Sequence, residues 1–176
     1  MDYVRVLDLI AERLEELSSR FMVVGGWAMN SYGRGRATFD LDLAVPHSVQ
    51  ADLVGLLESA GYETLHCSSG YSNHLHPSPD WGRVDVIYVR DETEARLFRD
   101  AVLRPVLPDR SALVPKPTHL VAMKVTAMKH DPSRRLDELA DIRALLRLSG
   151  TDPEEVREYF VRDGLLDDYE QITKTS

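Results

Sequence analysis

The amino-acid sequence predicts an α+β fold, in which a mixed β-sheet flanked by helices is followed by a C-terminal helical part. Short apolar and β-branched runs alternate with helical patterns over residues 1–110. From residue 118 onward, helical spacing of apolar residues dominates. The length of 176 residues is enough for one core domain with a helical appendage. We therefore divide the chain into a core of residues 1–110 and a helical region of residues 111–176, packed on that core.

Helices and strands are expected to alternate along the first region. The helices follow from apolar residues at helical spacing, with Ser48 as a suitable N-cap. They cover residues 3–18, 27–32, 48–60 and 92–102. The strands follow from alternation and from β-branched residues. They cover residues 21–24, 38–45, 62–66, 73–76 and 83–89, of which 73–76 is expected to be a short edge strand.

The second region begins after a segment rich in proline. Prolines at positions 105, 108, 115 and 117 predict a connecting segment, with a short strand at residues 112–114. Three helices should follow, over residues 118–129, from Arg134 or Leu136 to Leu148, and from the Asp152-Pro153 cap to Arg162. The charged tail from Asp167 is expected to be frayed.

Composition and charge exclude some function classes. The formal charge of −8 and the pI near 5.2 argue against a broadly basic surface that would hold nucleic acid, although a local basic patch could still bind RNA. One cysteine, Cys67, cannot form an internal disulfide, which fits a reducing compartment. No apolar run approaches the roughly 20 residues that span a bilayer, and acidic residues interrupt the N-terminus. We predict a soluble, cytoplasmic protein without a membrane partner.

Paired acids at the second predicted strand are the first sign of chemistry. In the run Phe39-Asp40-Leu41-Asp42-Leu43, apolar and acidic positions alternate. Successive side chains of a strand point to opposite faces, so Asp40 and Asp42 should stand side by side. Such like charges repel unless a cation or a proton neutralises them. A hard divalent cation is the natural occupant, since Mg²⁺ takes carboxylate, phosphate and water oxygens.

A glycine pair precedes these acids and could supply the other half of a site. Gly25 and Gly26 follow an apolar run, and a short helical segment follows them. Because glycine has no Cβ, its backbone can approach a ligand closely, and N–H groups at a helix start can hold phosphate. Alone, Gly-Gly is usually only a turn, and Asp-x-Asp is often only a solvated strand face.

A third acid lies in the strand predicted at residues 83–89. Val84, Val86 and Tyr88 should share one face, which leaves Asp85 on the other with Ile87. An acid on an otherwise apolar face is costly unless it is paired, protonated or bound to a cation. We therefore expect Asp85 to join Asp40 and Asp42, although a strand-end hydrogen bond would also explain it.

These residues together resemble a known signature. The pattern Val24-Gly25-Gly26 followed by Asp40-Leu41-Asp42-Leu43 is similar to that of the polymerase-β-like nucleotidyltransferase superfamily. The run Arg36-Ala-Thr38-Phe-Asp40-Leu-Asp42 resembles AbiE-type toxin nucleotidyltransferases. The run Gly25-Gly26-Trp27-Ala28 is instead similar to aminoglycoside and lincosamide nucleotidyltransferases, in which tryptophan follows the glycines.

The resemblance implies an activity and residue roles. It implies transfer of a nucleoside monophosphate from a triphosphate to an acceptor hydroxyl, with release of pyrophosphate and with Mg²⁺, or alternatively Mn²⁺, as the cofactor. Asp85 would accept the proton of the attacking hydroxyl. The catalytic and metal-binding residues would be Asp40, Asp42 and Asp85, and the nucleotide-binding residues Gly25, Gly26, Trp27, Arg36, Thr38 and Lys124.

Lys124 enters through a second, weaker resemblance. The segment 119–127 is similar to the Lys-x-x-Ala helix of AbiE-type enzymes, in which Lys124 would face the triphosphate. An exposed lysine lying along the surface is the simple alternative. Where that family has an arginine this sequence has Asp131, and Lys129 is the candidate substitute. Asp141, in a run similar to that family's Lys-Asp-x-x-Asp-Ile, is expected to orient the helix.

Three functions remain open from the sequence. The first is a toxin-like nucleotidyltransferase that modifies RNA, such as tRNA, or a protein, with a cognate antitoxin as a partner. The second is an aminoglycoside or lincosamide nucleotidyltransferase, favoured by Gly25-Gly26-Trp27 and by the acidic charge. The third is a non-catalytic binding module. Three histidines also suggest zinc, but no cysteine or acid lies at a recognised ligand spacing, so acceptor binding or simple exposure is preferred for His66, His74 and His76.

Overall fold

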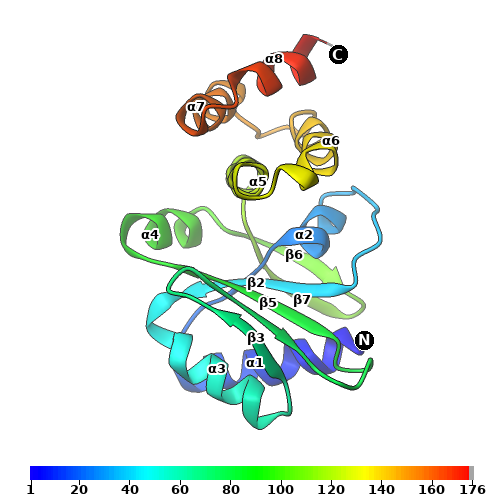
Figure 1. Ribbon diagram of the computed structural model, residues 1–176, viewed down its shortest axis with the longest axis vertical. Coiled ribbons are helices and arrows are strands. Elements are labelled where there is room, and N and C mark those ends of the chain that lie inside the picture. Colours follow the sequence, from blue (N-terminus) through cyan, green and yellow to red (C-terminus); the bar gives the residue numbers. More distant parts are fainter. Residues whose placement is uncertain (175–176) are drawn as a thin grey trace. The chain divides into compact units, whose positions relative to one another are not determined.

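The computed structural model describes residues 1–174, which fall into two compact units, residues 1–115 and residues 116–174 (Figure 1). A five-stranded sheet of order β1-β2-β5-β4-β3 organises the first unit. Its strands are β1 Met22–Val23, β2 Asp40–Pro46, β3 Glu63–Cys67, β4 Tyr71–Leu75 and β5 Arg83–Val89. The pair β2–β5 is parallel and the other pairs are antiparallel, so the predicted mixed sheet is confirmed.

Helices lie on both sides of this sheet (Figure 1). One side is covered by α1 Tyr3–Glu16 and by α3 Gln50–Ser59, which follows the short 3-10 helix η1 His47–Val49. Helix α1 begins where the Asp2 side chain accepts from the Arg5 amide, and its buried stripe includes Ile10 and Leu14. On the other side lie α2 Gly25–Ser31 and α4 Asp91–Arg99. The sheet therefore has one face packed on an apolar layer and one face that is only partly covered.

The strand expected at residues 73–76 is present, but the prediction that it lies at an edge of the sheet is wrong. Strand β4 lies inside the sheet, between β5 and β3. Its side chains Ser72 and His74 are buried, so its inward positions are polar and the sequence lacks the apolar alternation that would have identified an internal strand. Strand β3 is the edge instead, and it leaves the single cysteine, Cys67, exposed.

A separate hairpin replaces most of the expected connecting segment. Strands β6 Val102–Leu107 and β7 Arg110–Val114 form a two-stranded sheet, and Arg104 donates from its guanidinium to the Ser31 carbonyl. Pro105 misled the sequence analysis because proline is rare in paired strands. Here it lies beside a register shift of the ladder, where a missing N–H is tolerated.

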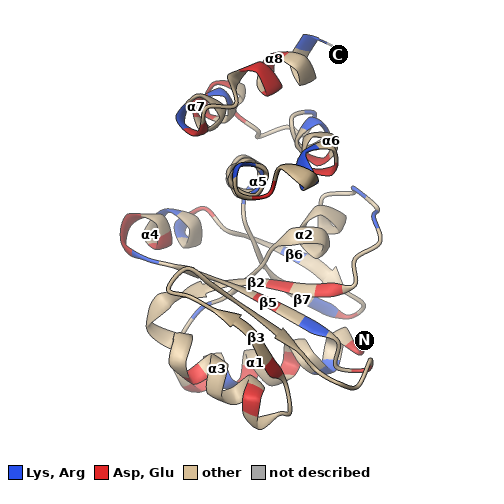
Figure 2. Cartoon of the chain, in the orientation of Figure 1, with Lys and Arg blue, Asp and Glu red and all other residues tan. Residues whose placement is uncertain are grey.

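The second unit is helical, as predicted. It contains α5 Pro117–His130, a 3-10 turn η2 Pro132–Arg134, α6 Arg135–Leu145, α7 Pro153–Asp163 and α8 Leu166–Lys174, and these helices carry charges of both signs (Figure 2). Asp152 caps α7 by accepting from the amides of Glu154 and Glu155. Among residues 1–174, no helix has the length and the apolar character to cross a membrane.

Over residues 167–174 the charged tail is not frayed, which corrects the expectation, and its last two residues lie outside the described part of the chain. It forms α8, and its Asp168 carboxylate accepts from the Arg135 guanidinium of α6 at 2.7 Å. Ile172 of the same helix is buried. The density of charge suggested disorder, but the ion pair of Asp168 with Arg135 and the burial of Ile172 give this short helix the tertiary contacts that stabilise it.

A chain of hydrogen bonds runs through the core beneath β4. The Thr64 hydroxyl donates to Glu58 at 2.7 Å, so it must accept from Nδ1 of His74 at 3.1 Å. Burial lowers the pKa of His74 and so favours the neutral ring, whose other nitrogen accepts from the Ser72 hydroxyl at 2.8 Å, while Ser72 accepts from Tyr88 at 2.6 Å. His74 is a buried core residue, so the expected exposure of this histidine is wrong.

Replacing His74 by glutamine should flatten the pH dependence of stability that sets in as the pH falls below about 6.5. Burial lowers the pKa of His74, although Glu58 and Asp85 oppose this. Below about pH 6.5 the unfolded chain binds a proton at His74 that the folded chain does not bind. The free energy of unfolding therefore decreases as the pH is lowered, by up to about 1.4 kcal/mol per pH unit. Urea unfolding at several pH values measures this slope.

The matched control for this prediction is Ser72→Ala. It breaks the same chain of hydrogen bonds but keeps the titrating ring, so it should lower stability and retain the slope. An unchanged slope in His74→Gln would contradict the assignment. The carboxylates with lowered pKa, such as Asp8 and Asp163, act below about pH 4 and do not interfere in this window.

Candidate functional site

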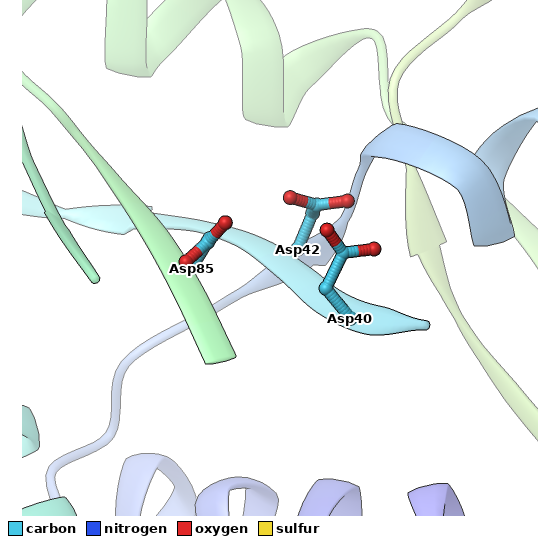
Figure 3. A group of neighbouring side chains, drawn as sticks. All are labelled: Asp40, Asp42 and Asp85. Carbon is cyan, nitrogen blue, oxygen red and sulfur yellow. The ribbon is translucent and has the colours of Figure 1, made fainter. Parts of the chain in front are cut away.

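Three carboxylates project from the partly covered face of the sheet (Figure 3). Strands β2 and β5 are parallel neighbours, and their register places Asp42 directly beside Asp85. Asp40 lies two residues earlier on β2 and so shares the face of Asp42. The residue between them, Leu41, points into the buried layer. The alternation read from the sequence thus delivers all three acids to one place.

The geometry of this acid trio, Asp40, Asp42 and Asp85, suits a divalent cation. Each residue offers one carboxylate oxygen, and these oxygens lie within 4.8 Å of one another. Oxygens that share one Mg²⁺ at about 2.1 Å lie within about 4.2 Å, so small side-chain adjustments bring the trio around an ion. All three are partly exposed, and so a ligand can reach them. Among the residues that the structure describes, this is the one acid, histidine or cysteine group that could hold a metal ion.

Two partners of Asp85 were missed by the sequence analysis. The Arg83 Nε donates to both Asp85 oxygens, at 2.8 and 3.0 Å, and the Asn73 amide donates to Oδ1 at 2.9 Å. The negative charge of the acid trio in turn raises the pKa of Arg83, mainly through the bond to Asp85. Arg83 could have been found, because it lies two residues before Asp85 and shares its strand face. Asn73 could not, because its position opposite Asp85 depends on the register of β4.

The glycine pair lies against the acids and forms the first turn of α2, two residues earlier than the predicted start. Gly25 has φ of +56°, in the left-handed region, and a Cβ on it would lie 1.9 Å from Oδ2 of Asp42. A Cβ on Gly26 would lie 2.5 Å from the hydroxyl of Thr38. Thr38 also donates to Oδ1 of Asp40 at 3.0 Å. The glycines are therefore required by contacts with the site itself.

Replacing Gly25 by alanine should displace the Asp42 carboxylate and weaken Mn²⁺ binding by about tenfold or more. The added methyl overlaps the carboxylate, and the backbone conformation is strained for any residue with a Cβ. Titration of Mn²⁺ by electron paramagnetic resonance measures this loss. Gly33→Ala is the control, because Gly33 also has positive φ but no atom lies within 4 Å of its Cβ position. Equal effects of both substitutions would assign the loss to backbone strain alone.

Arg36 and Trp27 are placed by the loop and helix around the acids. The Asn30 side chain bonds both backbone groups of Arg36, at 2.8 and 3.1 Å, and so fixes the loop between α2 and β2. Arg36 itself is exposed. The Trp27 indole N–H donates to the Asp40 carbonyl at 3.2 Å. Trp27 therefore contacts the backbone of the acid strand, and the nucleotide contacts of both residues stay predictions.

Lys124 lies in the second unit and has a different environment from the one expected. It is buried, and its ammonium donates to Glu138 and to Asp141 at 2.7 Å each. The exposed surface lysine considered as an alternative is wrong, because only 6% of the residue is exposed. Lys129, the candidate substitute cation, is paired with Asp163. The predicted contact between Lys124 and a triphosphate stays a prediction.

Within residues 1–174, none of the three histidines belongs to a group that could hold a metal ion, and acceptor binding stays a prediction. His66 stacks on Tyr71 with ring centroids 4.5 Å apart, and His76 stacks on Trp81 at 5.4 Å. His66 and Tyr71 lie on β3 and β4, on the sheet face that carries Asp85. An exposed ring pair thus lies on the same sheet face as Asp85, toward the β3 edge of the sheet.

Comparison with known proteins gives likeness in structure only. No family model matches the chain, and no curated protein matches it by sequence. The solution structure of the antibiotic-resistance factor ANT(2'')-Ia is similar with a TM-score of 0.67 and 16% identity, over 99% of this chain and 98% of that one. The lincomycin-bound lincosamide antibiotic adenylyltransferase LnuA matches with a TM-score of 0.54 and 15% identity, over 82% of this chain and 97% of that one.

A third similar structure is that of a CCA-adding enzyme in complex with ATP. It matches with a TM-score of 0.52 and 16% identity, over 97% of this chain but only 46% of that one. At such low identities the likeness establishes the fold. The chain has the polymerase-β-like nucleotidyltransferase fold that the sequence predicted, whereas the resemblance to AbiE-type toxins finds no match among these structures.

Proposed function

We propose that this protein is a Mg²⁺-dependent nucleotidyltransferase, which moves a nucleoside monophosphate from a triphosphate to an acceptor hydroxyl and releases pyrophosphate. The observation that carries the proposal is the acid trio, whose three carboxylates converge within 4.8 Å at a partly exposed place on this fold. Bound divalent cations would neutralise the charge of the attacking and leaving oxygens. Phosphoryl transfer asks mainly for such positioning and charge, so few protein groups are needed.

The three acids of the first unit would have different roles in the reaction. Asp40 and Asp42 would hold the cation, and Mn²⁺ should replace Mg²⁺ because it takes the same oxygen ligands. Asp85 would ligate the cation and accept the proton of the acceptor hydroxyl. Its Oδ1 already accepts from Arg83 and Asn73, whereas among the described residues its Oδ2 accepts from Arg83 alone and retains a lone pair for this proton.

The triphosphate would lie at the glycine turn. The amides of Gly25 and Gly26 can approach phosphate closely because no Cβ intervenes. Arg36, Thr38 and Lys124 would add hydrogen bonds and positive charge, and Trp27 would border the nucleotide. Without a cation this place carries three carboxylates, so binding of the triphosphate should depend strictly on added Mg²⁺.

Two acceptor classes follow from different observations. RNA, such as tRNA, or a protein is the acceptor of a toxin-like enzyme, which the run from Arg36 to Asp42 favours. A small molecule is favoured by Gly25-Gly26-Trp27 and by the acidic charge, which would attract a polycationic drug, and the fold is similar to that of an antibiotic-resistance factor. A cognate antitoxin belongs only to the first class. A non-catalytic binding module ranks third, because all three acids are present.

The test is incorporation of label from each α-³²P-labelled triphosphate, with Mg²⁺ and either total cellular RNA and protein or an aminoglycoside and a lincosamide. We expect label on one acceptor class and none with EDTA. Label on a drug alone would select the small-molecule acceptor, and label on RNA or protein the toxin-like one. No incorporation with any triphosphate, while Mn²⁺ binds, would leave the binding module as the function.

A further inference from the structure

The acid strand β2 loses its neighbour where the acids begin. Strand β1 has only two residues and pairs with Leu43 and Ala44 of β2. The next amide, Val24 N–H, still donates to the Asp42 carbonyl at 2.9 Å, and then the chain turns away into α2 at Gly25. The Asp40 carbonyl, which points to the same side of β2 as that of Asp42, therefore has no described strand beside it, and the Thr38 carbonyl precedes the first residue of β2.

Two aromatic side chains take the place of the missing strand. The Trp27 indole N–H donates to the Asp40 carbonyl at 3.2 Å, and the Tyr3 hydroxyl donates to the Thr38 carbonyl at 3.0 Å. The two rings pack edge to face with centroids 4.8 Å apart. Carbonyls 42, 40 and 38 thus accept in turn from the Val24 amide that follows β1, from Trp27 of α2 and from Tyr3 of α1, and the Asp40 carbonyl also lies 3.5 Å from the Thr38 hydroxyl.

This side-chain ladder, Trp27 with Tyr3, bears on the direction of the Asp40 carboxylate. A strand end with unpaired carbonyls frays, and the side chains that it carries then lose their fixed direction. Asp40 is the first residue of β2, so its carboxylate is the member of the acid trio most exposed to such fraying. Tyr3 also lies close enough to interact electrostatically with this carboxylate, because the pKa of Tyr3 is raised by burial and by the charge of Asp40.

We propose that Trp27 and Tyr3 are positioning residues, which extend the ladder of β2 and so hold Asp40 in the cation site beside Asp42 and Asp85. This inference rests on the proposed function, because it requires that the acid trio binds a divalent cation. The inference assigns Trp27 a role in holding the backbone of the acid strand. It assigns the same role to Tyr3, which the sequence did not indicate as a site residue.

The test is Mn²⁺ binding measured by electron paramagnetic resonance on the purified full chain. Trp27→Phe keeps a ring but removes the N–H, and Tyr3→Phe removes only the hydroxyl. We expect the affinity for Mn²⁺ to fall about tenfold in Trp27→Phe and about threefold in Tyr3→Phe, whose carbonyl lies two residues farther from the trio. The matched control is Tyr62→Phe, which removes the same kind of bond, from the Tyr62 hydroxyl to the Trp81 carbonyl at 2.7 Å.

The outcomes separate the inference from the proposed function. Weaker Mn²⁺ binding in both ladder variants, with Tyr62→Phe equal to the wild type, supports the inference. Wild-type affinity in both ladder variants would overturn it and leave the cation site intact. A wild type that binds no Mn²⁺ would overturn the proposed function and the inference together. Should Trp27→Phe fail to fold, Tyr3→Phe decides, because it removes a single oxygen.

Discussion

Replacing Asp42 by asparagine should reduce nucleotidyl transfer by at least about 10³-fold while the protein stays folded. Asp42 is the central member of the acid trio, since it lies beside Asp85 in the register and against Gly25. Asparagine has nearly the same shape, so the contact with Gly25 is kept, but one of three negative charges is lost. Because the trio's repulsion also falls, the melting temperature should be unchanged or slightly raised.

The control for this substitution is Asp52→Asn. Asp52 is also a partly exposed acid of the first unit, but it is paired with Arg13 on the side of the sheet that α1 and α3 cover. The substitution Asp52→Asn should leave the transfer rate within about twofold of the wild type, since exposed ion pairs contribute little to stability. Incorporation of label into the acceptor and Mn²⁺ affinity are measured for both variants. Activity in Asp42→Asn comparable to that in Asp52→Asn would remove Asp42 from the reaction.

Replacing Lys124 by methionine should lower the free energy of unfolding by about 3–5 kcal/mol. The ammonium of Lys124 lies between the carboxylates of Glu138 and Asp141, and all three side chains are nearly inaccessible to water. Removing the cation leaves two carboxylates close together in a medium that solvates charge poorly. Urea unfolding followed by circular dichroism measures the loss.

A compensated variant separates charge from packing. Lys124→Met combined with Glu138→Met and Asp141→Leu removes all three charges and should recover most of the lost stability, because apolar groups of similar volume replace buried ion pairs well. If the triple variant stayed as unstable as Lys124→Met, loss of charge balance would not be the cause. The same variant tests the predicted nucleotide contact: a raised KM for the triphosphate supports it, and an unchanged KM leaves Lys124 a structural role.

The sequence predicted the acid trio because strand alternation is a local property. Asp40 and Asp42 share a face whatever the strand pairs with, and Asp85 stood out as an acid on an apolar strand. Their convergence needed the parallel pairing of β2 with β5, which only the superfamily resemblance supplied. Contacts that depend on register or on neighbouring helices, such as Asn73 with Asp85 or Tyr3 with Thr38, left no mark in the sequence.

Several of the wrong predictions share one physical cause. Polar residues were taken as exposed, whereas His74 and Lys124 are buried with hydrogen-bonded or charged partners on neighbouring elements. Those partners satisfy the polar groups and remove the cost of burial. The tail from Asp167 became helical for the same reason, through the pair of Asp168 with Arg135. In each case the burial of a polar group depended on which residue pairs with it, and composition and periodicity do not contain that information.

The most direct test of the account is a crystal structure of the protein soaked with Mn²⁺ and a non-hydrolysable nucleoside triphosphate. The account predicts anomalous density for manganese within coordination distance of carboxylate oxygens from Asp40, Asp42 and Asp85, with the triphosphate reaching the glycine turn. Manganese bound elsewhere, or a triphosphate that does not touch the metal at the acid trio, would contradict it.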